Sequence, residues 1–144
     1  MARRSSVQGN FKLRGLLRRI GNQMESDLRP AMVQAANLVL ATQQRLIPRD
    51  PSSSEHIEDE LEAFVSKSGL DAQIGIRGKK DNRKFFYGRF LEYGTKQYTR
   101  GDSTVAARPA HPWLRPSYDM NREQIVDLIT KAIASTLRKA AEAK

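Results

Sequence analysis

Apolar residues recur at helical spacing through the first third of the chain. Positions three and four apart form one stripe, as in an amphipathic helix. Pro30 interrupts the stripe, because proline lacks a backbone donor and disfavours helical geometry at Arg29. The pattern predicts either a kinked helix or two helices meeting near residues 27–30, and Pro48 ends it. The stripe consists of Leu13, Leu16, Leu17, Ile20, Met24, Leu28, Met32, Ala35, Leu38, Val39 and Leu46.

The middle of the chain has the pattern of strands and loops. Residues 47–54 are rich in Pro and Ser, as in an exposed loop, and residues 55–62 carry five acids in a segment that is either helical or extended. Residues 64–68 and 72–76 alternate like strands, and Gly69-Leu70-Asp71 between them suits a hairpin turn. We therefore expect a two-stranded hairpin.

The last third starts with an aromatic segment at residues 85–93, which predicts a third strand or a short helix. Residues 94–111 are too rich in Gly, Thr, Arg and Ala for a core element and predict a long loop. A final helix follows, with Ser117 as its expected N-cap and Asp119 in its first turn. Its apolar stripe is Ile125, Val126, Leu128, Ile129, Ala132, Ile133, Leu137 and Ala140.

This order of elements predicts an α+β fold, in which a small antiparallel sheet is packed by a long, Pro-kinked N-terminal helix and a C-terminal helix. A chain of 144 residues suits a single domain spanning residues 1–144. Within it, residues 1–10 are expected to be a flexible arm and residues 94–111 a long assembly loop.

Charge is unevenly distributed in a chain whose formal net charge is +9. The first twenty residues contain no acid, and a second basic run lies between residues 79 and 89. Such patches bind DNA or an acidic protein partner, and they also occur on solvated helix faces. Direct DNA recognition is the less favoured interpretation, because no aromatic stacking residues are interleaved in the first patch. The candidate contacts are Arg14, Arg18, Arg19, Lys79, Lys80, Arg83 and Lys84.

Several classes of protein are excluded or disfavoured. The chain has no Cys, which excludes disulfides, thiol catalysis and Cys-based zinc sites. Its basic start is followed by no apolar stretch, so we expect no signal peptide and no membrane partner. His56 lies among acids but no second ligand cluster has metal spacing, so no metal and no cofactor are expected. Glu92 beside Tyr93 and Thr95 lacks a second acid, base or metal, so no catalytic residue is assigned and the chain is not expected to be an enzyme.

Three motifs, taken together, resemble a family of tailed-bacteriophage morphogenesis proteins, the gene-product-ten-like head-tail joining or minor tail family. The first is Leu46-Ile47-Pro48-Arg49-Asp50. The second is Tyr87-Gly88-Arg89-Phe90-Leu91-Glu92-Tyr93-Gly94-Thr95, and the third is Ala107-Arg108-Pro109-Ala110-His111-Pro112-Trp113-Leu114-Arg115-Pro116. The chain departs from the family where Pro51-Ser52-Ser53-Ser54 replaces the usual Thr-Gly pair and where the link between Gly94 and Arg108 is longer.

The resemblance implies a structural virion protein of the phage neck or tail, made in the host bacterial cytoplasm. It implies a ring of several copies, six being the expected number, which acts in head-tail joining or tail completion as a tail terminator. The implied partners are further copies of the chain, the tail tube protein and the head-tail connector or adaptor proteins, with DNA passing through the lumen. The alternative is a basic DNA-binding protein acting on phage DNA.

The residues of the second and third motifs are the candidates for assembly contacts. Gly94 permits a turn, Thr95 can bond backbone groups, and Glu92 is expected to pair with Arg108 or Arg115. Trp113 is either an interface anchor or a residue packed under the last helix of its own chain, and both interpretations stay open. A further hypothesis pairs the acidic residues 55–62 with the basic N-terminal helix of a neighbouring copy. The interface candidates are Glu92, Tyr93, Gly94, Thr95, Arg108, Pro109, Pro112, Trp113, Leu114, Arg115 and Pro116.

Overall fold

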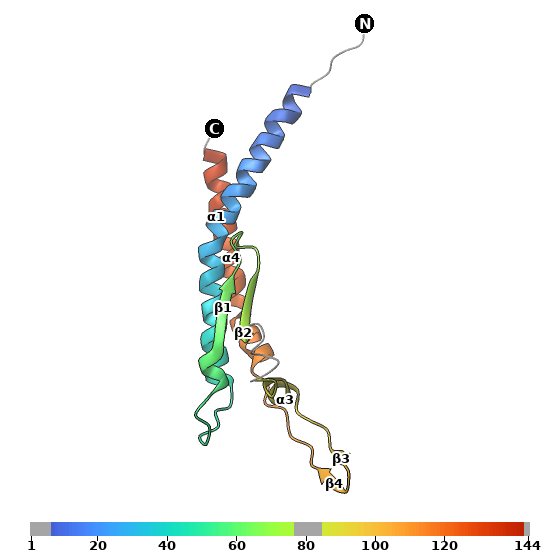
Figure 1. The fold of residues 1–144 in the computed structure, drawn as a ribbon. Coiled ribbons are helices and arrows are strands. Elements are labelled where there is room, and N and C mark those ends of the chain that lie inside the picture. The colour runs from blue at the N-terminus through green and yellow to red at the C-terminus, as the bar shows by residue number, and fades with distance from the viewer. Residues whose placement is uncertain (1–6, 77–84, 143–144) are drawn as a thin grey trace.

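Two long helices dominate the structure, a computed structural model that describes residues 7–76 and 85–142 (Figure 1). Helix α1 spans Val7–Leu46 and helix α4 spans Leu114–Glu142. Between them come the 3₁₀ helix η1 (Ile57–Glu60), the hairpin of β1 (Leu61–Val65) and β2 (Ala72–Ile76), the short helix α3 (Gly88–Tyr93), and the ribbon of β3 (Tyr98–Arg100) and β4 (Ser103–Val105). The fold is α+β, as the sequence predicts.

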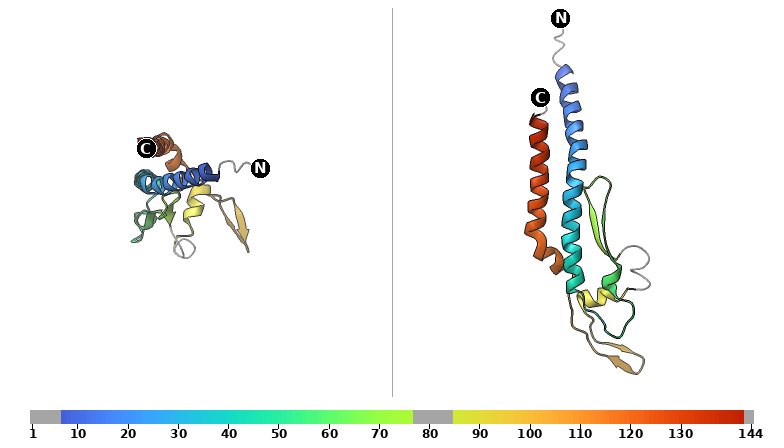
Figure 2. Two further views of the ribbon diagram at one scale, coloured as in Figure 1. Left: turned by 90° about the horizontal axis from the view of Figure 1, so that it is seen from above. Right: turned by 90° about the vertical axis from the view of Figure 1, so that its left-hand side faces the viewer.

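Helix α1 lies in the middle of the molecule. Helix α4 runs antiparallel along one side of it and the β1–β2 hairpin packs on another side (Figure 2). The expectation that both helices pack on the sheet is therefore wrong for most of α4, whose main neighbour is α1. The layers run α4, α1 and then the hairpin.

Helix α1 continues through Pro30 as one helix, so of the two predicted alternatives the break into two helices is wrong. Its N-terminal half leans away from the line of its C-terminal half (Figure 1). Proline inside a helix costs roughly 3 kcal/mol. Packing from two sides offsets this cost: the hairpin turn touches α1 beside Pro30, where a Cβ on Gly69 would lie 2.7 Å from the Arg29 Cα, and α4 contacts Asp27.

Two polar contacts set the register of α1 against α4. The Asn121 amide donates to the Thr42 hydroxyl at 2.8 Å, and the Thr136 hydroxyl donates to the Asp27 carboxylate at 2.8 Å. The two contacts are fifteen residues apart along each helix, or about 22 Å. Ser117 and Thr136 are the buried residues of α4, whereas its predicted apolar stripe stays partly or largely exposed.

The hydrophobic core lies where the C-terminal end of α1 meets the base of the hairpin and the start of α4. Phe85 and Trp113 are each 2% exposed. Ile47 reaches the core because Pro48 ends the helix and turns the chain there, as the sequence predicts. The cluster consists of Ile47, Ile57, Leu61, Phe85 and Trp113, with Leu40, Leu46, Ile76, Leu91 and Leu114 packed against it.

The second strand of the hairpin, β2, has the predicted bounds 72–76, whereas the first strand and the turn differ from the prediction. Strand β1 begins at Leu61 and ends at Val65, three residues earlier than expected at both ends, and Leu61 pairs with Ile76. The turn is wider than predicted, because the Ser66 and Ser68 side chains bond backbone amides and each other in it. Of the acidic segment 55–62, residues 57–60 form η1 and residues 61–62 begin β1.

The aromatic segment, residues 94–111 and the N-terminal arm can also be compared with their predicted structures. The aromatic segment forms helix α3, which is one of its two predicted states. Residues 94–111, expected to be a loop, carry the β3–β4 ribbon, because Gly101 at φ 62 forms a tight turn between facing Thr99 and Thr104. Of the expected flexible arm 1–10, residues 7–10 belong to α1 and the others lie outside the described residues.

Candidate functional site

Glu92 organises the end of the molecule where the second and third motifs meet. Its carboxylate accepts backbone N–H groups at the start of α4, from Trp113 at 2.7 Å, Leu114 at 2.8 Å and Arg115 at 3.2 Å. The first amides of a helix have no partners within the helix and carry partial positive charge, so a carboxylate there stabilises the helix start. Glu92 is 5% exposed and therefore acts as a buried cap.

This cap corrects two expectations. Glu92 does not form the predicted ion pair with Arg108 or Arg115, because its oxygens are used by backbone amides. The Arg115 guanidinium lies instead 3.9 Å from Asp119. Helix α4 also starts at Leu114, before the predicted N-cap Ser117, whose hydroxyl bonds the Leu114 carbonyl at 2.6 Å. The last three residues of the third motif, Leu114, Arg115 and Pro116, therefore belong to α4.

Gly94 and Thr95 join α3 to the ribbon as predicted. Gly94 has φ 68, and a Cβ there would lie 2.7 Å from the Arg108 carbonyl oxygen. Thr95 and Arg108 exchange two backbone hydrogen bonds of 3.0 Å, and the Thr95 hydroxyl accepts a third from the Arg108 N–H. His111 N–H donates to the Leu91 carbonyl at 2.7 Å. The ribbon is thus fixed at its base, while its strands are exposed apart from Val105.

Trp113 lies in the core of its own chain, so the structure favours the intrachain interpretation for this residue. The neighbouring Pro109 and Pro112 are exposed, and Tyr93 is 80% exposed. Leu114 and Pro116 are half-buried at the start of α4. Accessible members of the predicted interface therefore surround a buried centre formed by Glu92 and Trp113.

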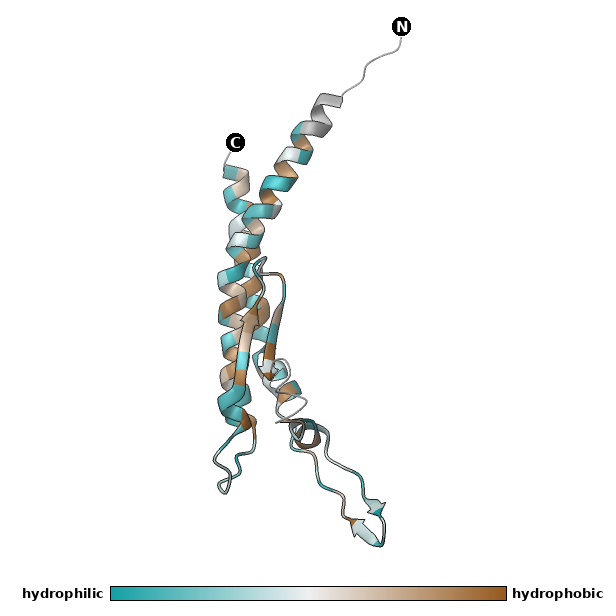
Figure 3. Cartoon of the chain, in the orientation of Figure 1, coloured by the Kyte–Doolittle hydropathy of each residue, from teal (hydrophilic) through white to brown (hydrophobic). Residues whose placement is uncertain are grey.

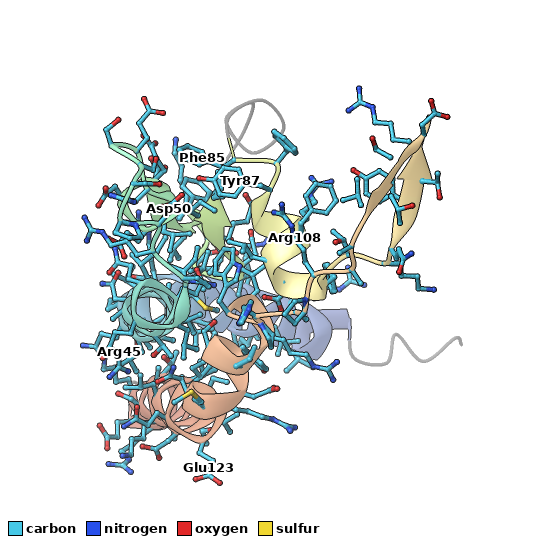
Figure 4. All side chains as sticks on the ribbon, turned by 90° about the horizontal axis from the view of Figure 1, so that it is seen from below. Arg45, Asp50, Phe85, Tyr87, Arg108 and Glu123 are labelled. Carbon is cyan, nitrogen blue, oxygen red and sulfur yellow. The ribbon has the colours of Figure 1, made fainter. Side chains whose placement is uncertain are left out.

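Exposed aromatic side chains extend this surface. Residues Phe86, Tyr87, Phe90, Tyr93 and Tyr98 all expose more than a third of their area. A hollow of about 580 Å³ between α3 and the ribbon is lined partly by Tyr87, Phe90 and Tyr98. Arg108 lies beside α3 on the ribbon side in Figure 4. Sequence analysis identified the aromatic segment but not that it would face solvent.

A second hollow lies at the same end of the molecule, next to the Pro48 corner. It measures about 470 Å³ and is lined by Pro48, Arg49, Asp50, Ser53, Glu55, His56, Ile57, Glu58, Tyr87 and Leu91. We call it the acidic groove, because Asp50, Glu55 and Glu58 contribute carboxylates to its lining, and the Arg49 guanidinium pairs with Glu58. Asp50 and Tyr87 lie close to Phe85 in the view of Figure 4.

The ionisable groups of the acidic groove influence one another. Hydrogen bonds from the Ser52 hydroxyl and amide, at 2.6 and 2.9 Å, lower the pKa of Asp50, so this carboxylate stays charged. Burial raises the pKa of the Tyr87 phenol, and the charges of Asp50 and Glu55 raise it further. Asp50 and Glu55 therefore place negative charge near the Tyr87 wall of the groove.

Positively charged residues lie at the other end of α1. Residues 12–19, which we call the basic arm, comprise Lys12, Leu13, Arg14, Gly15, Leu16, Leu17, Arg18 and Arg19, and all are exposed. Apolar positions continue along α1 into this arm (Figure 3). Lys79, Lys80, Arg83 and Lys84, the other predicted contacts, lie outside the described residues.

Sequence analysis missed the polar pairs between the helices. Asp27 receives hydrogen bonds from the Thr136 hydroxyl, from Lys139 at 3.2 Å and from Gln23 at 3.1 Å. The first two, in that order, lower the pKa of Asp27. The available signal was that Asp27 and Thr136 each come three residues after an apolar stripe position, Met24 and Ile133.

Within residues 7–76 and 85–142 no cluster of three or more His, Cys, Asp or Glu side chains could hold a metal ion. In the same ranges, no helix is both long and apolar enough to span a membrane. Comparison with protein-family models, with curated proteins and with solved structures found no match.

Proposed function

We propose that this chain is a structural subunit of a tailed-phage virion, which assembles into a ring at the neck between the head connector and the tail tube. In this proposal it acts in head-tail joining or tail completion by binding its neighbours and not by catalysis. The phage assignment rests on the resemblance of three sequence motifs to the head-tail joining family.

The observation that carries an assembly role is the balance of exposed and buried apolar surface. Within the described residues, fifteen large hydrophobic side chains are exposed, whereas ten hydrophobic residues are buried, three of them alanines. Exposed apolar surface of this extent is typical of protein interfaces. The exposed residues lie on the basic arm, on the hairpin, around α3 and the ribbon, and along α4.

The arrangement of the three motifs supports the same proposal. Ile47 of the first motif packs in one cluster with Trp113 of the third, and Glu92 of the second motif caps the helix that follows Trp113. Motifs that are far apart in sequence thus form one structural unit, beneath an exposed aromatic surface. A shared structural role explains why these residues occur together.

Light scattering of the purified chain, alone and with tail tube protein or head connector, tests the proposal. A defined ring, or a monomer that forms one on either partner, supports it. A chain that stays monomeric at every concentration and binds neither partner overturns it.

A second candidate function, DNA binding, is favoured by the exposed arginines of the basic arm. Each phosphate contact should contribute roughly 0.9 to the log-log slope of affinity against salt. Anisotropy of labelled duplex DNA at two salt concentrations, with the wild type and with Arg14→Gln, Arg18→Gln and Arg19→Gln combined, measures this slope. Binding that is weak and equal in both proteins excludes this function for the arm.

A further inference from the structure

The basic arm carries an apolar stripe that is largely exposed in the described part of the chain, and Leu16 borders a hollow that Lys139 and Ala140 of α4 also line. Leu13, Leu16 and Leu17 are 53%, 43% and 58% exposed. At 3.6 residues per turn they lie on the same side of α1 as Asp27, which contacts α4. In the antiparallel pair Thr42 faces Asn121 and Asp27 faces Thr136. By the same spacing, Gly21 of α1 lies level with Glu142, the last described residue of α4. The backbone of the stripe therefore lies beyond the described end of α4.

Positive charges flank this stripe on both sides. By helical geometry, Lys12 and Arg19 lie next to Leu16, and Arg14 lies next to Leu17. A partner for the arm therefore needs apolar surface between carboxylates. Pairing of two arms would satisfy the leucines but would bring like charges together, which disfavours it.

The acidic groove has the required chemistry. Pro48, Ile57 and Leu91 supply apolar surface, and Asp50, Glu55 and Glu58 supply carboxylates around it. Its volume of about 470 Å³ admits side chains from one helix face and not a whole helix. Burial raises the pKa of the Tyr87 phenol, and the charges of Asp50 and Glu55 raise it further, as expected when both carboxylates lie near the groove wall.

We propose that the basic arm of one copy docks in the acidic groove of the next, through Leu13, Leu16 and Leu17 with Arg14 and Arg19 beside the groove carboxylates. The arm and the groove lie at opposite ends of α1, roughly 50 Å apart by helix rise. The arm of one chain therefore cannot reach the groove of the same chain. Every copy presents an arm at one end and a groove at the other. Such head-to-tail contacts form rings when the rotation between copies closes. The proposal rests on the proposed assembly function and identifies the surfaces that perform it.

Charge reversal tests both surfaces separately. The arm variant combines Arg14→Glu with Arg19→Glu, and the groove variant combines Glu55→Lys with Glu58→Lys. Each should raise the concentration needed for assembly at least tenfold. The matched controls are Arg122→Glu with Lys131→Glu, and Glu123→Lys with Asp127→Lys, which reverse exposed charges of α4 away from both the arm and the groove and should leave the arm-to-groove contact unchanged. Fluorescence of Trp113, the single tryptophan, reports whether each variant is folded.

Mixing the two variants distinguishes a head-to-tail contact from a symmetric one. The groove variant keeps a normal arm, the arm variant keeps a normal groove, and the reversed arm is complementary in charge to the reversed groove. The mixture should therefore assemble, with the two variants alternating, where neither variant assembles alone. A chain carrying both reversals should assemble with itself again. Two variants that assemble like the wild type, or a mixture that assembles no better than either variant alone, overturn the docking proposal while leaving ring formation intact.

Cross-linking keeps the test decisive even when the variants fold poorly or the wild type associates weakly. The chain has no cysteine, so Arg18→Cys and Glu55→Cys each introduce a single thiol. A short bismaleimide should join the two proteins when mixed and should join neither to itself. Arm-to-arm products overturn the proposal, as does loss of DNA binding without loss of assembly in the arm variant. Failure of the wild type to bind itself, tail tube or connector rejects the proposed function instead.

Discussion

The hydroxyl of Thr136 donates a 2.8 Å hydrogen bond to the carboxylate of Asp27 across the interface between α4 and α1. Thr136 is 0% exposed, and its hydroxyl also lies 3.1 Å from the Ala132 carbonyl. Because the buried Thr136 hydroxyl bonds a charged carboxylate that lies partly buried between the helices, this contact is central to the pairing of α1 and α4.

Replacement of Thr136 by Val should destabilise the chain by about 1–3 kcal/mol, because Val keeps the shape and removes the donor to Asp27. Urea unfolding followed by Trp113 fluorescence measures the change. Thr130→Val, at an exposed position of the same helix, is the control and should change stability little. Equal effects of the two substitutions would contradict a role for the hydrogen bond.

Stability should decrease as the pH falls below the usual aspartate pKa of 3.8, because the pKa of Asp27 is lower in the folded chain. A lowered folded-state pKa means that the charged carboxylate stabilises the fold above 3.8 and that this contribution is lost as it protonates. Asp27→Asn should therefore show a smaller decrease in urea midpoint between pH of about 5 and about 3 than the wild type. Asp50, whose pKa is also lowered, contributes to both curves, and Asp50→Asn separates its share.

Glu92→Gln should destabilise the chain by about 1.5–3 kcal/mol, because the amide has one acceptor oxygen where the carboxylate has two, and its NH₂ group faces N–H donors. The single tryptophan is adjacent to this cap and should report local loosening in its fluorescence. Glu123→Gln on the outer side of α4 is the matched control (Figure 4). A neutral Glu92→Gln would show that the capping contacts contribute little.

Gly94→Ala should detach the base of the ribbon, since the new Cβ would lie 2.7 Å from the Arg108 carbonyl and the φ of 68 is strained for alanine. We expect a loss of roughly 1–3 kcal/mol and faster tryptic cleavage after Lys96 and Arg100. Gly101→Ala has a similar φ of 62 but open space around it, so it measures backbone strain alone. Cleavage rates that are the same in both variants would show that the close approach at Gly94 is unimportant.

Much of the fold follows from local patterns in the sequence. The two long helices, the hairpin and the end of α1 before Pro48 were predictable because apolar spacing and proline act locally. The start of α4 was not, since its cap comes from Glu92, more than twenty positions earlier in the chain. Continuity of α1 through Pro30 likewise depends on Gly69 and Thr136, which are distant in sequence.

The candidate surfaces were predictable only in part. The motifs around Glu92 and Arg108 were identified, but burial of Trp113 depends on the Ile47 corner, which no local pattern shows. The ribbon had a local signal, since Gly101 and Asp102 lie between residues that favour strands. The acidic groove could not be predicted, because its wall combines the Pro48 loop with α3.

The polar pairs between α1 and α4 also determine how far α1 protrudes beyond the end of α4. Sliding α4 along α1 by one helical turn would break the hydrogen bond between Thr42 and Asn121 and the hydrogen bond between Asp27 and Thr136 at the same time. Any other register of the two helices therefore loses two hydrogen bonds. The length of α1 that protrudes is therefore constant from copy to copy. In the assembly proposed above, the protruding length of α1 in each chain would set the repeat distance between subunits. Inserting two helical turns before Ile20 should therefore lengthen this repeat distance by about 11 Å.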